Sequence, residues 1–155
     1  MLTELNKLRQ FCAYQERSHH ETRYKCLELG LRGEEVDQAI AALIADNFLN
    51  EERFAKAFAG GKFRIKQWGR KKILLELKQR QVSAYCIKKA MEEIDMDDYI
   101  AVLEKITAKK YLSLNSEPPI KRKYKTIQYL LSRGYEQDLI QDALEKVNND
   151  NSDSF

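Results

Sequence analysis

The sequence contains few residues that interrupt helices, with two prolines and six glycines among 155 residues. Folds with many strands need these residues at their turns, so the scarcity argues against a β-rich fold and permits long helices. Long apolar runs are also missing, since no stretch reaches the roughly 18 apolar residues that a membrane-spanning helix requires. We therefore expect an all-α protein, of the size of one ordinary domain, that does not cross a membrane.

Cysteine is scarce and scattered, at positions 12, 26 and 86. An odd number of distant cysteines is typical of reduced thiols, and not of a disulfide framework or a zinc knuckle. The first residues, MLTELNKLRQFCAYQERS, are charged early and lack the apolar stretch of a secretory signal. Both features predict a cytoplasmic protein.

Histidines and glycines do not form the patterns that catalysis or cofactor binding would need. His19 and His20 are adjacent, so they point to different sides of a helix and cannot jointly bind a metal there. Gly60-Gly61 is not followed by the lysine and hydroxyl residue that end a phosphate-binding loop. Acid pairs such as Asp97-Asp98 suit the first turns of helices. We therefore expect no enzyme, no metal and no cofactor.

Basic charge, by contrast, is abundant and concentrated in one segment. Between Gly60 and Met91, ten lysines and arginines accompany a single acid, although the whole chain has a net charge of only +3. Such a run is either a solvated helix face or a surface for a polyanion. Phe63 and Trp68 lie among these charges and favour a binding surface, because aromatic and arginine side chains are enriched at interfaces.

The 3.6-residue spacing of apolar side chains predicts a succession of amphipathic helices. These helices cover residues 2–17, 19–29, 69–80, 97–111, 121–133 and 136–147, and further helices begin at Gly33, Asn50 and Ser83. The side chains of Asn50 and Ser83 are expected to cap the first turns of their helices. Gly30 and Gly134 are expected to end helices in a left-handed turn.

An internal repeat of helix, tight turn and helix occurs three times, at a pitch of 51 and then 53 residues. The equivalent residues are Cys26, Leu77 and Leu130; Leu31, Val82 and Tyr135; Val36, Ile87 and Ile140; and the pairs Ala39-Ile40, Ala90-Met91 and Ala143-Leu144. Such units stack on their neighbours, because none can bury its apolar face alone. The predicted parts are an N-terminal helix (1–18), repeats (19–67, 68–112 and 120–147), a linker (113–119) and a disordered tail (148–155).

Two motifs, in order, resemble the signature of the RecX regulatory proteins. LNEERFAKAF (49–58) is similar to an L-(D/N)-(D/E)-E-R-F-A box, and FRIKQWGRKKILLEL (63–77) is similar to a basic aromatic stretch followed by Gly and an I-x-x-E-L helix. The resemblance covers roughly residues 15–147. It implies tandem three-helix, helix-turn-helix-like modules that form an elongated, curved body.

The resemblance also implies a function. RecX proteins bind the filament of the RecA recombinase on single-stranded DNA, and they modulate, usually inhibit, its ATPase and strand exchange. We thus expect a monomeric regulator of recombination, DNA repair and the SOS response. Its expected partners are RecA and single-stranded DNA, and it is also expected to bind duplex DNA without sequence specificity. Two alternatives stay open, a stand-alone helical DNA-binding regulator and a helical scaffold for proteins only.

The sequence departs from the family pattern in two places. Gly60-Gly61 stands where other members have a continuous helical run, so we expect this helix to break early. The third unit lacks a clear third helix after residue 147.

The basic residues and the aromatic residues among them are the expected contacts with DNA or RecA, because cations can neutralise phosphates and aromatic rings can stack on bases. These candidates are Lys62, Phe63, Arg64, Lys66, Trp68, Arg70, Lys71, Lys72, Lys78, Arg80, Lys121, Arg122, Lys123 and Lys125. For Trp68, core packing between repeats is the alternative to a contact. Asn50, Glu51 and Arg53 are expected to cap and stabilise their own helix and not to contact a partner.

Overall fold

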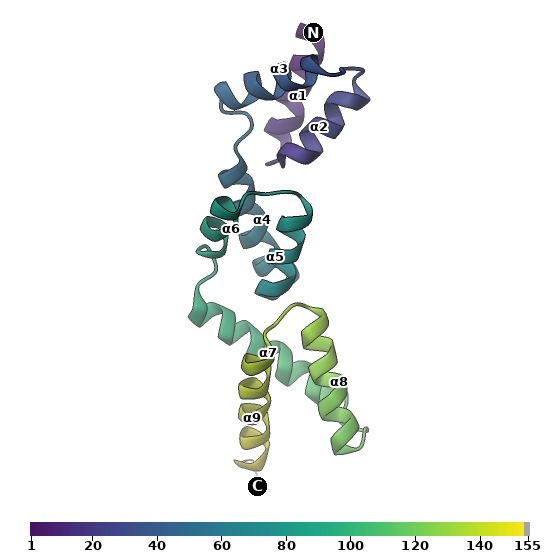
Figure 1. Ribbon diagram of the computed structural model, residues 1–155. Helices are drawn as coiled ribbons and strands as arrows, with labels where there is room; N and C mark the ends of the chain where they lie inside the picture. The colour runs from purple at the N-terminus through teal and green to yellow at the C-terminus, as the bar shows by residue number, and fades with distance from the viewer. Residues whose placement is uncertain (154–155) are drawn as a thin grey trace. The chain divides into compact units, whose positions relative to one another are not determined.

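The computed structural model describes residues 1–153, with side chains through residue 150, and within that range it contains nine helices and no strand (Figure 1). The helices are α1 (Leu2–Tyr14), α2 (His19–Glu28), α3 (Glu34–Ala45), α4 (Glu51–Lys66), α5 (Arg70–Gln79), α6 (Ala84–Met91), α7 (Met96–Ser113), α8 (Pro119–Ser132) and α9 (Gln137–Asp153). The predicted all-α class is confirmed. None of these helices combines the length and the apolar character needed to span a bilayer.

The chain divides into two compact units. Unit 1 comprises Met1–Gly60 and Glu76–Glu93, and unit 2 comprises Gly61–Leu75 and Ile94–Phe155. In unit 1, α1, α2 and α3 pack on one another around a core that includes Leu8, Cys26 and Leu43. In unit 2, α7 contacts both α8 and α9. Tyr99 and Tyr135 are its largest fully buried side chains.

Side-chain caps begin the helices where the sequence predicts them. The amide of Arg53 donates to Oδ1 of Asn50 at 2.8 Å, and the amide of Cys86 donates to Oγ of Ser83 at 3.3 Å. These caps satisfy amides that have no partner within the first turn of a helix. A capping box at Ser18, reciprocated by Glu21, begins α2 and was not predicted.

The tight turn that ends α2, α5 and α8 has the same hydrogen bonds each time. In each turn, one backbone amide donates to the carbonyl of the residue five positions earlier: Leu31 to Cys26 (3.0 Å), Val82 to Leu77 (3.2 Å) and Tyr135 to Leu130 (3.2 Å). The residue directly before each donor has positive φ, namely Gly30 (92°), Gln81 (59°) and Gly134 (98°). This is the Schellman arrangement. The predicted repeat is therefore present in the backbone itself.

The repeated apolar positions are buried as predicted. Leu77 and Leu130 have no exposed surface, and Ile87 and Ile140 are 7% and 0% exposed. Leu77 and Leu130 lie one turn before the positive-φ residue of their repeats, and Ile87 and Ile140 lie in the helices that follow it. The turn and the apolar positions thus define one local core per repeat.

Two expectations about helix ends are wrong. Helix α4 continues through Gly60-Gly61 to Lys66. Phe54 and Phe63 of this helix are both buried, and the burial of its apolar side outweighs the low helix propensity of the two glycines. Helix α9 likewise continues to Asp153 across most of the expected tail, because adding residues to an existing helix is easier than starting one. Residues 154 and 155 lie outside the described residues.

Gly61→Ala is expected to raise the free energy of unfolding by about 0.5–1 kcal/mol, since alanine loses less backbone entropy in a helix. A Cβ at Gly61 would meet nothing within 4 Å. The matched control is Gly69→Ala, whose Cβ would lie 2.2 Å from the carbonyl carbon of Gly134, and it should destabilise the protein. Urea denaturation measures both. A Gly61→Ala protein no more stable than the wild type would contradict the expectation.

Leu77→Ala and Leu130→Ala are each expected to lower the free energy of unfolding by about 2–4 kcal/mol, because both leave a cavity at a fully buried repeat position. Leu75→Ala is the control on the same helix as Leu77, since its side chain is 55% exposed and its loss should cost less than about 0.5 kcal/mol. Equal costs for Leu75 and Leu77 would refute the role of the repeat positions in the core.

Candidate nucleic-acid and partner interface

The first turn of α5 is built against the last turn of α8, within unit 2. The amide of Gly69 donates to the carbonyl of Arg133 at 2.7 Å, and the amide of Lys71 donates to the carbonyl of Gly134 at 2.9 Å. Carbonyls at the end of one helix therefore satisfy free amides at the start of another. The approach requires glycine on both sides, because a Cβ at Gly69 would overlap Gly134 and one at Gly134 would overlap Lys72.

Arg70 closes this junction with a hydrogen-bonded network. Its amide donates to the Tyr99 hydroxyl at 2.8 Å, and that hydroxyl donates to Oε1 of Glu136 at 2.5 Å. The Arg70 Nε donates to the other carboxylate oxygen of Glu136 at 2.6 Å, and the guanidinium lies 4.8 Å from the centre of the Tyr99 ring. The sequence suggested Arg70 as a contact residue. In the structure its guanidinium is paired with Glu136 within unit 2, and the contact with a partner stays a prediction.

Three aromatic rings form the core beneath this network. The ring centres of Phe63 and Tyr99 are 5.7 Å apart, and those of Tyr99 and Tyr135 are 5.2 Å apart, distances at which aromatic pairs attract. Phe63 is 6% exposed. It therefore supports the junction, and a base or a partner could reach its ring only by opening the core.

Burial also changes the acidity of the two tyrosines. Burial raises the pKa of Tyr99 far above its ordinary value, and the hydrogen bond to Glu136 adds to the effect. Burial raises the pKa of Tyr135 to about 12. The Tyr135 hydroxyl donates to the carbonyl of Gln67 at 2.8 Å, which fixes the loop between α4 and α5.

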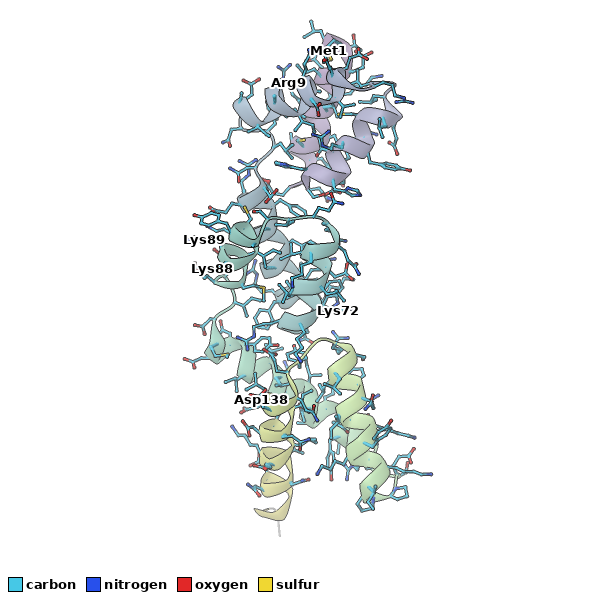
Figure 2. The ribbon with its side chains drawn as sticks, in the orientation of Figure 1. Met1, Arg9, Lys72, Lys88, Lys89 and Asp138 are labelled. Atoms are coloured by element: carbon cyan, nitrogen blue, oxygen red, sulfur yellow. The ribbon has the colours of Figure 1, made fainter. Side chains whose placement is uncertain are left out.

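Trp68 lies in that loop between two lysines. The Nζ atoms of Lys62 and Lys72 are 5.0 Å and 4.4 Å from the centre of its ring, within the range of cation–π attraction. Trp68 is half-buried, so neither full core packing nor a freely exposed ring describes it. Lys72 projects from the first turns of α5 (Figure 2). The indole thus gathers two cations at one place on unit 2.

Other cations of the basic segment divide into exposed and paired residues. Arg64, Lys66 and Lys71 in unit 2 and Lys78 in unit 1 are exposed, and none forms an ion pair with a carboxylate of the described part of the chain. Arg80 differs, since it binds the carboxylate of Glu76 at 2.7 Å one turn earlier. The exposed residues are the ones whose charge is available to a partner.

The basic start of α8 divides in the same way. Lys121 and Lys123 are exposed and form no ion pair among the described residues. Arg122 donates to the carbonyl of Tyr111 at 2.8 Å, and its guanidinium lies 3.6 Å from the centre of that ring. Lys125 forms an ion pair with Glu117 at 2.5 Å. Of the four residues predicted here, Lys121 and Lys123 are therefore the two whose charge is available to a partner.

A second group of cations in unit 2 escaped the sequence analysis. These cations are Lys109 and Lys110 on α7 and Arg133 after α8. They lie in the region 92–155, where acids outnumber bases, so the net charge of that region does not reveal them. The structure places the Lys110 ammonium 4.5 Å, and the Arg133 guanidinium 5.7 Å, from the centre of the Tyr129 ring. The adjacent pair Lys109-Lys110 is the signal that could have identified them.

Known families and structures match most of the chain. A family model described as "RecX, second three-helix domain" matches residues 50–91, and one described as "RecX, third three-helix domain" matches residues 97–144. The Regulatory protein RecX of Haemophilus influenzae (strain PittEE) is 31% identical over 130 residues, covering 83% of this chain and 84% of the relative. That of Clostridium perfringens (strain 13 / Type A) is 30% identical over 135 residues, covering 86% of this chain and 63% of the relative.

A solved structure supports the same fold. The crystal structure of RecX from Lactobacillus salivarius matches with a TM-score of 0.81 at 17% identity, covering 96% of this chain and 99% of that chain. A second, described as the crystal structure of regulatory protein RecX, gives a TM-score of 0.82 and covers 91% of this chain and 71% of that one.

The matched domains begin one helix earlier than the repeats predicted from the sequence. They correspond to α4–α6 and to α7 with α8 and the start of α9. Counted from α7, as in the matched family model, the third domain has three helices, whereas the described part of the predicted unit from residue 120 contains only α8 and α9. A repeat in sequence fixes the spacing of the units but not which helix comes first. The predicted limits at 68, 113–119 and 120 stay a prediction.

Stability is expected to fall at alkaline pH because of the buried tyrosines. Folding raises the pKa of Tyr135 from 10.0 to about 12, so the unfolded chain releases its proton first, and stability present below pH 10 is lost as the pH rises towards 12. Tyr135→Phe should weaken this dependence, while losing the bond to Gln67 costs about 1–3 kcal/mol at neutral pH. Denaturation from pH 8 upwards measures it.

The control is Tyr124→Phe, because that tyrosine is 63% exposed and its removal should leave the pH dependence unchanged. An alkaline dependence that Tyr135→Phe does not alter would contradict the assignment.

Proposed function

Because the chain belongs to the RecX family, we propose that it regulates the RecA recombinase without catalysing a reaction itself. The regulated form is the RecA filament on single-stranded DNA, and the effect is inhibition. The protein acts as a cytoplasmic monomer in recombination, DNA repair and the SOS response. Its relatives are named regulatory proteins, at 30–31% identity over most of this chain, and this supports the regulatory role.

The observation that carries the DNA contact is the group of exposed cations around Trp68. Arg64, Lys66 and Lys71 are exposed in one compact unit and are not neutralised by described carboxylates. Cations in this state gain most from a phosphate backbone, because binding releases the counterions that DNA holds. Lys62 and Lys72 add two charges beside them at the indole.

The alternative of a stand-alone DNA reader has less support. A helix-turn-helix reader presents its basic helix after the turn, whereas α5 carries its exposed cations before the turn at Gln81. After that turn, α6 carries the exposed Lys88, and Lys89, which is 3.9 Å from Glu92 and 5.6 Å from the centre of the Tyr85 ring. Most exposed cations of the segment therefore come before the turn, which favours contact with a backbone over contact with base edges.

The double variant Arg64→Ala, Lys71→Ala tests the proposal. If each residue neutralises one phosphate, affinity for single-stranded DNA should fall and the slope of log affinity against log salt should flatten by about 1.4, at about 0.7 for each contact. The loss should be similar on different sequences, and inhibition of the DNA-dependent ATPase of RecA should weaken in parallel. Arg70 is left intact, because its loss would open the network with Tyr99 and Glu136.

The control is Lys7→Ala, Lys105→Ala, which also removes two exposed lysines that form no ion pair among the described residues. It should bind DNA and inhibit RecA as the wild type does. Equal losses in both variants would mean that only total charge matters. Unchanged RecA activity in the presence of the wild-type protein would refute the regulatory proposal, whatever its affinity for DNA.

A further inference from the structure

Unit 2 contains a small pocket whose lining residues are not among the proposed DNA contacts. It measures about 210 Å³ and is lined by Gln67, Ile106, Lys109, Lys110, Ser113 and Tyr129. The residues come from α7, from α8 and from the loop after α4. The pocket therefore joins three segments that are distant in sequence, and its shape depends on the folded unit.

The polar groups that line the pocket suit an anion. Two ammonium groups and a glutamine amide can donate hydrogen bonds to a ligand, whereas the Ser113 hydroxyl already donates to the carbonyl of Lys110 at 2.6 Å, and no carboxylate is among the lining residues. Neither Lys109 nor Lys110 forms an ion pair with a carboxylate that the structure describes. Their charge is therefore not neutralised at the pocket.

Tyr129 holds Lys110, one of the two lysines that line the pocket, in place, and its ring also contacts Arg133, which does not line the pocket. The Lys110 ammonium is 4.5 Å from the centre of its ring, and the Arg133 guanidinium is 5.7 Å from the same centre. Arg133 is itself fixed by a hydrogen bond to the carbonyl of Lys66. Attraction to an aromatic face restricts the flexible lysine side chain, so less entropy is lost when an anion binds.

The size of the pocket limits its ligand. Sites for whole cofactors and drug-sized molecules usually measure about 300–1,000 Å³, so 210 Å³ suits one group of a larger ligand. A phosphate group matches both the size and the charge. A nucleic-acid backbone supplies such groups as part of a long chain, and free phosphate supplies them singly.

We propose that this pocket binds one backbone phosphate of single-stranded DNA, with Lys109 and Lys110 as the contacts and Tyr129 as a positioning residue. The inference rests on the proposed function and adds a subsite that lies outside the basic segment 60–91. It adds to the third three-helix domain a DNA contact on α7, besides the predicted contacts at Lys121 and Lys123 on α8. The pocket carries no information about base sequence, because it holds a phosphate.

The test is the double variant Lys109→Ala, Lys110→Ala, with Lys7→Ala, Lys105→Ala as the charge-matched control. Lys105 is an exposed lysine on the same helix, one turn before Lys109 and outside the pocket. Loss of one phosphate contact should flatten the salt slope on single strands by about 0.7, while the control keeps the wild-type slope. Equal slopes in the two variants would overturn the subsite.

Tyr129 is tested separately, because it acts through Lys110. Tyr129→Phe keeps the aromatic ring and should bind single strands as the wild type does, whereas Tyr129→Leu should lose affinity with both lysines still present. Equal binding by the two variants would overturn the positioning role. Thermal denaturation of each variant excludes unfolding as the cause of a loss.

Inorganic phosphate distinguishes a failure of the subsite from a failure of the proposed function. Amide NMR signals of Gln67 and Ser113 should shift on addition of phosphate to the wild-type chain and stay unchanged in the Lys109→Ala, Lys110→Ala variant. Shifts without any effect of the variant on DNA binding would mean that the pocket takes free phosphate only, which overturns the proposal. DNA binding that depends on Arg64 and Lys71, with no shifts, would overturn the subsite and leave the proposed function standing.

Discussion

The meeting of two helix ends, at Gly69 and Gly134, is the constraint on which unit 2 depends. Two carbonyls at the end of α8 accept hydrogen bonds from the amides of Gly69 and Lys71 at the start of α5. The amide of Arg70, the residue between these two, donates to the Tyr99 hydroxyl. No side chain fits between the two backbones. The loop with Trp68 and the first cations of α5 therefore have fixed positions, although they lie far from α8 in sequence.

The chain uses its two kinds of cation differently. Four arginines of the basic regions are committed to the fold: Arg70 to Glu136, Arg80 to Glu76, Arg122 to the Tyr111 carbonyl and Arg133 to the Lys66 carbonyl. In the basic segment and at the start of α8, the exposed cations without a described ion pair are lysines, with Arg64 as the exception. A planar guanidinium donates in fixed directions and suits a built-in contact, whereas an ammonium on a flexible stem stays hydrated and adapts to a partner. Counting positive charge alone cannot separate these two roles.

What the sequence could predict follows from the range of the interactions involved. Caps at Asn50 and Ser83 and the glycine turns are local, and each appears as predicted. The partner of Arg70 lies 66 residues away, and nothing within α5 indicates it. The helix through Gly60-Gly61 persists because of packing, which outweighs local propensity. The pocket at Tyr129 arises from three segments, so only the folded chain reveals it.

The position of Trp68 has a practical consequence. It is the only tryptophan in the chain, and two lysine ammonium groups lie over its ring. A polyanion that draws these ammonium groups away changes the electric field at the indole, and the colour and intensity of indole fluorescence depend on that field. The unmodified protein therefore carries its own optical reporter between Lys62 and Lys72 of the basic segment. Titrations need no attached dye, and stopped-flow mixing can time the encounter with DNA directly.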